Sequence, residues 1–162
     1  FFLFLFRLGK NFQTEMYLKI TGKMQKCTVG ILGGILLALA LWCLVTKADK
    51  VTVLYNLLYY TVFIAFAEEF VVRGICVYLV RGEEPYIRYL APNLLFAVMH
   101  LFSYANWGAI TVPYVISFVS SELLGLLTMG CIFQFLKEKS GTLWTAVLVH
   151  AILDYSVVLS YQ

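Results

Sequence analysis

Long apolar stretches alternate with short polar segments along this chain of 162 residues. Five of the stretches have the length of a membrane-spanning helix, which needs about 20 predominantly apolar residues. They cover residues 28–46, 51–80, 88–104, 110–136 and 142–161. The second is long for one crossing, so a tilted or protruding helix is expected there. The pattern predicts an all-α membrane protein, a bundle of at least five transmembrane helices in one domain, residues 28–162.

Polar and helix-breaking residues separate these stretches. The connections are residues 47–50, 81–85, 106–108 and 137–141. Gly and Pro in the second connection commonly end a helix. Residues 1–27 mix basic side chains with apolar ones, and we expect a connecting segment that lies along a membrane surface. The Phe and Leu residues at its start are expected to be the end of an upstream membrane helix.

Composition supports a membrane protein with several crossings. Hydrophobic residues make up 62% of the chain and charged residues 13%, against about 25% charged in soluble domains. No cluster of basic and aromatic side chains favours a nucleic acid as partner. The four cysteines form no CxxC pair and no metal-binding spacing, so they are expected to be packing residues.

Basic residues orient the predicted helices. If the crossings alternate, one membrane face receives Arg7, Lys10, Lys19, Lys23, Lys26, Arg81, Arg88, Lys137 and Lys139. The opposite face receives Lys47 and Lys50. Because Lys and Arg are enriched in cytoplasmic loops, the first face is expected to be cytoplasmic.

Several ionisable side chains fall inside the predicted helices. They are Glu68, Glu69, Arg73, His100, Glu122, His150 and Asp154. Such groups are costly at membrane depth and commonly mark a functional site. Glu69 and Arg73 are four residues apart, so they share a helix face and can form an ion pair. His150 and Asp154 have the same spacing and can project into one cavity.

Three of these side chains are expected at similar depth. Glu68 lies about twelve residues before the cytoplasmic end of its helix, roughly 18 Å from that face. His100 lies about twelve residues after the start of its helix at the same face, again roughly 18 Å. His150 lies about eight residues in, roughly 12 Å. Three helices therefore bring a carboxylate and two histidines to one shared site.

Two kinds of hydrolytic chemistry suit such a set. A carboxylate near a histidine can hold a water and take its proton during attack on an amide, while a second histidine stabilises the oxyanion. Alternatively, Glu68, His100 and His150 are a common ligand set for a catalytic zinc ion with an open fourth position. The spacing does not choose between them, so the cofactor is either absent or zinc.

Three motifs on successive helices resemble those of one enzyme family. In chain order they are Glu68-Glu69-xxx-Arg73, Phe96-xxx-His100 and His150-xxx-Asp154. They are similar to the EExxxR, FxxxH and HxxxN or HxxxD motifs of the CPBP family, the CAAX proteases and bacteriocin-processing enzymes. The resemblance covers residues 30–161 and implies an intramembrane endopeptidase.

The resemblance implies a role for each matching residue. Glu68 and His100 are expected to activate the water, and His150 and Asp154 to contact the oxyanion or the substrate. Many relatives have Asn at position 154. An ionised Asp is a poor oxyanion donor, so Asp154 is expected to be protonated, to orient His150 or to bind a metal.

The remaining polar residues are expected to support the site. Glu69 and Arg73 shape it, either as a structural ion pair or within the catalytic set. Phe96 packs against His100. Glu122 belongs to none of the motifs, and it either bonds to a neighbouring helix or lines the site.

We therefore expect an endopeptidase that cuts a membrane-associated or lipidated peptide, from a cavity open to the cytoplasm. Its compact size favours a bacterial cytoplasmic membrane and a role in bacteriocin processing or self-immunity over the processing of prenylated tails. Two classes of protein compete with the enzyme. One is a membrane immunity or binding protein without catalysis, and the other is a proton-coupled transporter that uses the same polar residues.

Overall fold

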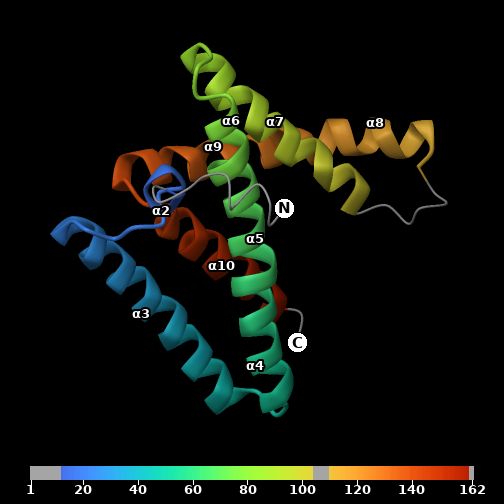
Figure 1. The fold of residues 1–162 in the computed structure, drawn as a ribbon. Helices are drawn as coiled ribbons and strands as arrows, with labels where there is room; N and C mark the ends of the chain where they lie inside the picture. Colours follow the sequence, from blue (N-terminus) through green and yellow to red (C-terminus); the bar gives the residue numbers. More distant parts are fainter. Residues whose placement is uncertain (1–11, 104–109, 161–162) are drawn as a thin grey trace.

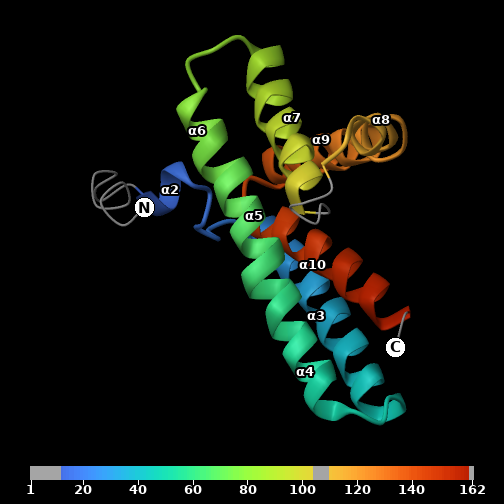
Figure 2. The same cartoon turned by 90° about the vertical axis from the view of Figure 1, so that its right-hand side faces the viewer.

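The computed structural model describes residues 12–103 and 110–160, and almost all of them are helical (Figures 1 and 2). Helices account for 86% of the described residues, and the described residues form no strand. The all-α expectation is therefore confirmed. The helices in chain order are α2 (Phe12–Glu15), α3 (Lys23–Thr46), α4 (Lys50–Leu58), η2 (Tyr59–Phe66), α5 (Ala67–Glu69), η3 (Phe70–Cys76), α6 (Val77–Leu79), α7 (Pro85–Ser103), α8 (Val112–Ser121), α9 (Leu123–Ser140) and α10 (Leu143–Ser160).

Five of these segments, α4 to α6, form one long continuous helix (Figure 1). Its segments η2 and η3 have the wider π-helical turn, on either side of the short α5. Asp49 begins this helix, because its Oδ1 accepts a hydrogen bond from the Thr52 backbone N–H at 3.1 Å. Hydrogen bonds from Thr52 also hold the pKa of the Asp49 carboxyl below its ordinary value.

The C-terminal helix α10 holds the bundle together. It packs against α3, against the long helix and against α9 (Figure 2). One core cluster lies between α3, the long helix and α10, where Tyr155 is fully buried and its hydroxyl donates to the Val53 carbonyl at 3.3 Å. A second cluster joins Met16 to Phe70, Leu143 and Val147.

Helix α3 carries the strongest membrane signal. Among the described residues it is the one helix that is long and apolar enough by itself to cross a membrane. Trp42 and Val45 expose 67% and 80% of their surface. Large exposed apolar surface is typical of contact with lipid or with another protein. The expected five crossings stay a prediction.

Several predicted boundaries differ in the structure, and α7 begins at Pro85 and α9 ends at Ser140, both inside predicted connections. Helix α3 begins at Lys23, inside the predicted surface segment of residues 1–27, and the Gln25 side chain accepts from the Gly22 N–H at its start. The stretch 110–136 is not one straight helix, because α8 and α9 meet at Glu122 with a bend of 46°. The predicted turn at residues 106–108 and the apolar start at residues 1–6 lie outside the described residues.

Candidate functional site

Two consecutive carboxylates stand at the middle of the long helix. Successive helical residues point about 100° apart, so Glu68 and Glu69 face different neighbours. The Glu69 side chain is completely buried, whereas that of Glu68 keeps one third of its surface exposed. Both belong to α5, between the two π-helical segments, and π-helical turns frequently occur at functional sites.

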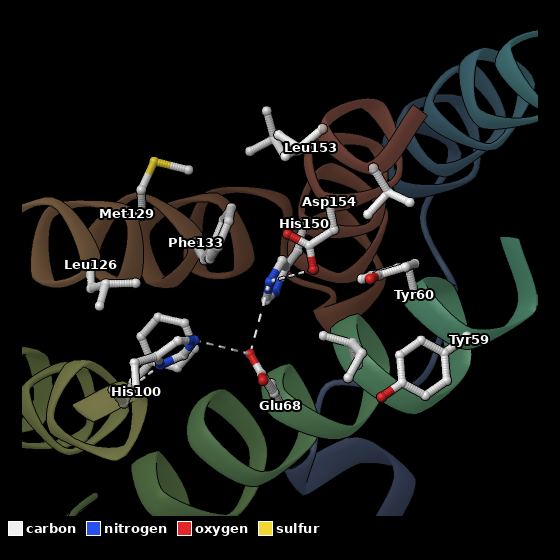
Figure 3. Close-up of a pocket in the computed structure, with 14 residues that line it drawn as sticks. Tyr59, Tyr60, Glu68, His100, Leu126, Met129, Phe133, His150, Leu153 and Asp154 are labelled. Carbon is white, nitrogen blue, oxygen red and sulfur yellow. Dashed lines mark hydrogen bonds and ion pairs between the residues drawn. The ribbon is translucent and has the colours of Figure 1, made fainter. Parts of the chain in front are cut away.

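A cavity of about 560 Å³ opens beside Glu68 (Figure 3). Its walls come from the long helix, α7, α9 and α10. The lining residues are Tyr59, Tyr60, Ile64, Glu68, Phe96, His100, Leu126, Met129, Phe133, His150, Leu153, Asp154, Val157 and Val158. Polar chemistry is concentrated on four of them, and the remaining walls are mainly apolar or aromatic.

Glu68 lies between the two histidines (Figure 3). Its Oε2 is 4.0 Å from His100 Nε2 and 3.9 Å from His150 Nε2. These separations are too long for direct hydrogen bonds, and Oε2 is buried without a hydrogen-bond partner. The structure thus brings together the three side chains that the sequence placed at similar depth, from α5, α7 and α10.

Phe96 and the backbone of α7 orient His100. The His100 Nδ1 lies 2.9 Å from the Phe96 carbonyl oxygen, and the two rings make an edge-to-face contact with centroids 4.5 Å apart. A carbonyl can only accept, so Nδ1 carries the proton in this contact. In the neutral ring, Nε2 is then the acceptor, and this nitrogen faces Glu68.

Carboxylates contact both ring nitrogens of His150. Nδ1 lies 2.9 Å from Glu69 Oε1, and Nε2 lies 3.4 Å from Asp154 Oδ2. The Phe133 ring stacks on the imidazole with centroids 4.8 Å apart. Glu69, Asp154 and Phe133 therefore fix the position of His150, which lines the same cavity as Glu68 and Asp154.

A buried ion pair between Arg73 and Glu69 holds the carboxylate that contacts His150. Arg73 Nη1 donates to Glu69 Oε1 at 3.0 Å, and neither side chain is exposed. The predicted ion pair is therefore confirmed. Arg73 Nη2 donates to Asn93 Oδ1 at 3.0 Å, and the Phe96 ring lies 4.4 Å from the guanidinium carbon. Buried charges need such partners, because an unpaired charge in an apolar interior is very costly.

The donor set does not have the geometry of a metal site. Two ligands bound tetrahedrally to zinc at about 2.0–2.1 Å lie about 3.3 Å from each other. Glu68 Oε2 is farther than this from the Nε2 atoms of both His100 and His150. Within residues 12–103 and 110–160, no group of three His, Cys, Asp or Glu side chains is arranged to hold a metal ion. We therefore derive no step through a metal.

The structure adds residues that the sequence motifs did not indicate. Asn93 bonds to Arg73, Phe133 stacks on His150, and Gly130 lies where α9 meets both Asn93 and Arg73. Asn93 precedes His100 by seven residues, which is two helical turns and the same face. That spacing was the feature of the sequence that could have indicated Asn93. Glu122 is exposed at the bend between α8 and α9 and does not line the cavity.

Comparison with known proteins gives one match. Residues 50–156 match the family model described as type II CAAX prenyl endopeptidase Rce1-like. The matched range contains all residues of the three sequence motifs. The searches of curated proteins and of solved structures gave no match.

Proposed function

Because this chain belongs to the Rce1-like family of type II CAAX prenyl endopeptidases, a family of integral membrane proteases, we propose that it hydrolyses a peptide bond in a membrane-associated, prenylated peptide. One observation carries the proposal. The buried Oε2 of Glu68 faces the Nε2 atoms of both His100 and His150 within 4.0 Å, at the wall of a single cavity.

Glu68 and His100 activate the water in this proposal. A water that bridges them donates one hydrogen bond to the Glu68 carboxylate and the other to His100 Nε2, which is an acceptor because Nδ1 donates to the Phe96 carbonyl. Glu68 takes the proton as the water oxygen bonds to the scissile carbonyl carbon. The same proton then moves to the leaving amine as the C–N bond breaks, and Glu68 returns to its starting form.

His150 stabilises the oxyanion. Both of its ring nitrogens face carboxylate oxygens, Glu69 Oε1 and Asp154 Oδ2, so both are placed to donate hydrogen bonds. Nε2 lies at the cavity, where the negative charge of the tetrahedral intermediate develops. Asp154 orients this ring, because its Oδ2 lies 3.4 Å from His150 Nε2. An ionised Asp154 can have this role, since it only has to accept a hydrogen bond. Fixed donors of this kind are worth several kcal/mol because they need no reorganisation, roughly 3–4 kcal/mol for one donor.

Apolar walls on both sides of Glu68 suit a lipidated substrate. Tyr59, Ile64 and Val157 line the cavity from η2 and α10, and Leu126 and Met129 line it from α9. Such surfaces bind aliphatic chains and exclude water from the reacting carbonyl. The match to a family of CAAX prenyl endopeptidases also favours a prenylated substrate over bacteriocin processing or self-immunity. A transporter needs titratable groups spread along a path, whereas Glu68, the histidines and Asp154 line one cavity.

Cleavage of a peptide panel tests the proposal. Purified protein in lipid nanodiscs is mixed with prenylated peptides and with the same peptides lacking the prenyl group, and mass spectrometry identifies the products. We expect wild type to cut the prenylated set, and Glu68→Gln to be at least about 100-fold slower. Glu83→Gln, on the exposed connection between α6 and α7, is the control and keeps the wild-type rate.

Two results would refute this mechanism. A Glu68→Gln variant that cleaves at the wild-type rate would show that Glu68 is not the general base. A folded wild-type protein that cuts no peptide would favour the binding or transport alternatives. A parallel sample with a zinc chelator distinguishes the chemistry. Activity that persists with chelator supports the carboxylate mechanism, whereas its loss, with recovery on added zinc, supports the metal mechanism.

A further inference from the structure

Arg73 is a buried cation with two hydrogen-bonded side-chain partners of different kinds. Nη1 donates to the charged Glu69 and Nη2 to the neutral Asn93, each at 3.0 Å. Asn93 is itself 1% exposed. Because separate side chains hold Nη1 and Nη2, these two hydrogen bonds restrict rotation of the guanidinium.

We propose that Asn93 is a positioning residue, whose Oδ1 fixes Arg73 so that Glu69 holds His150 Nδ1 in the catalytic orientation. The chain of contacts runs from Asn93 to Arg73, to Glu69 and to His150, with distances of 3.0, 3.0 and 2.9 Å. The catalytic meaning of this inference rests on the proposed function. Its structural part, control of the His150 ring by Asn93, is independent of it.

The orientation of the Asn93 amide is set by a second bond. Its Nδ2 donates to the Tyr89 carbonyl oxygen at 2.7 Å, one helical turn earlier on α7. The nitrogen must point there because a carbonyl accepts but does not donate. Oδ1 therefore points at Arg73, and the amide is anchored to the backbone of α7 rather than to another mobile side chain.

Gly130 on α9 provides the space for this contact. A Cβ atom at position 130 would lie 2.8 Å from Asn93 Oδ1 and 2.9 Å from Arg73 Nη2. Both distances are shorter than a carbon can approach, so any other residue must displace Asn93, Arg73 or the helix. The absence of a side chain at this position thus lets α9 close over the hydrogen bond. Gly125, on the same helix, has no atom within 4 Å of the corresponding point, so it is a matched control.

A purely structural Asn93 and a positioning Asn93 give different kinetic results. If Asn93 only supports the fold, its loss lowers the amount of folded protein and leaves kcat of the folded fraction unchanged. If it positions His150, the loss acts on the transition state, because His150 stabilises charge that develops there. Misplacement of a catalytic group by about 1 Å costs about 100-fold. The split between kcat and KM separates the two cases.

The kinetic experiment compares Asn93→Leu with Asn93→Asp. Leu has a similar volume and no acceptor, whereas Asp keeps an oxygen that can accept from Arg73. We expect Asn93→Leu to lower kcat about 10- to 100-fold with KM within about twofold of wild type. Asn93→Asp keeps the acceptor but loses the donor to the Tyr89 carbonyl, so it is expected to restore part of this loss. Gly130→Ala should lower kcat similarly, and Gly125→Ala should not change it.

A second readout needs no substrate. The chain has two histidines, so protein labelled with ¹⁵N-histidine gives imidazole signals from His100 and His150 alone, and a His100→Gln variant assigns them. We expect Asn93→Leu and Gly130→Ala to shift the Nδ1 signal of His150, which bonds to Glu69, and to leave the His100 Nδ1 signal near its wild-type position. Asn93→Asp should return the His150 signal toward wild type.

The two readouts separate the possible failures. A His150 signal that is unchanged in folded Asn93→Leu overturns the inference, whatever the activity. Equal changes of kcat in Gly125→Ala and Gly130→Ala overturn it as well. If the wild-type protein cuts no peptide but the His150 signal shifts as expected, the proposed function fails while Asn93 still controls the ring. If Asn93→Leu does not fold, Gly130→Ala carries the test with Asn93 in place.

Discussion

At the scale of single residues, neighbouring carboxylates have distinct tasks because their surroundings differ. Glu69 is fully buried, with Arg73 and His150 as hydrogen-bonding partners. Glu68, the preceding residue, borders the cavity with an oxygen that has no hydrogen-bond partner. A carboxylate that is already paired with an arginine is a poor base, so Glu68 is the one suited to take a proton from water. The Arg73 pair leaves Glu68 available for chemistry.

Loss of Arg73 should destabilise the protein strongly. Arg73→Leu leaves Glu69 as a buried carboxylate without its cation, and breaking a buried pair in this way costs about 3–5 kcal/mol. Arg81→Leu is the matched control, because Arg81 forms an exposed ion pair with Glu15 at 3.3 Å, and such pairs contribute about 0–1 kcal/mol. The free energy of unfolding in mixed detergent micelles measures both. Equal losses in the two variants would contradict the burial argument.

The sequence indicated the charged residues of this cluster and Phe96, and it did not indicate Asn93 or Gly130. Glu68, Glu69, Arg73, His100 and His150 could be identified because an ionisable group is conspicuous in an apolar helix and the i, i+4 rule pairs two of them. Asn93 and Gly130 carry no charge. Their role depends on the distance between α7 and α9, which is a property of packing, and the seven-residue spacing of Asn93 from His100 was the single local signal.

At the scale of elements, a short N-terminal segment ties several helices together. Met16 is fully buried against Phe70 of η3 and against Leu143 and Val147 of α10. The Tyr17 carbonyl, with the residue at a φ of 56°, accepts hydrogen bonds from Thr142 Oγ1 at 3.2 Å and from the Leu143 N–H at 2.8 Å. This segment holds the start of α10, which carries His150, against the long helix that carries Glu68.

Truncation of Met16 tests this connection. Met16→Ala removes a fully buried side chain and is expected to cost about 2–5 kcal/mol, as for other core Met to Ala changes. Met24 is the matched control because it exposes 83% of its surface, and Met24→Ala should change the stability by less than about 0.5 kcal/mol. Thermal unfolding of both variants in the same detergent gives the comparison. A Met16→Ala variant as stable as Met24→Ala would mean that the segment is not part of the folded core.

The bend between α8 and α9 shows where the apolar pattern is insufficient. Residues 110–136 are uniformly apolar enough to predict one helix, but the structure bends by 46° at Glu122. Ser120 and Ser121 both donate their hydroxyl groups to the Ser117 carbonyl, at 3.0 and 2.8 Å. Such local bonds compete with the helical ladder and favour a bend. Hydrophobicity alone does not register this competition.

At the scale of the whole molecule, helices from distant parts of the chain converge on one cavity. The long helix, α7, α9 and α10 each contribute a wall of the same cavity (Figure 3). The connections at either end of the long helix lie at opposite ends of the molecule (Figure 1). The unequal distribution of Lys and Arg between these ends predicts that the end with residues 81–85 is cytoplasmic, and the five crossings stay a prediction from the apolar stretches.

The most direct test of the central claim is a double-mutant cycle on Glu68 and His100, with kcat for a prenylated peptide as the measured quantity. If both residues act on one water, Glu68→Gln and His100→Gln remove the same step, and the double variant is about as slow as the slower single variant. Circular dichroism and thermal unfolding confirm that all three variants are folded. Effects that multiply in the double variant would show that Glu68 and His100 act independently, which contradicts their action on one water.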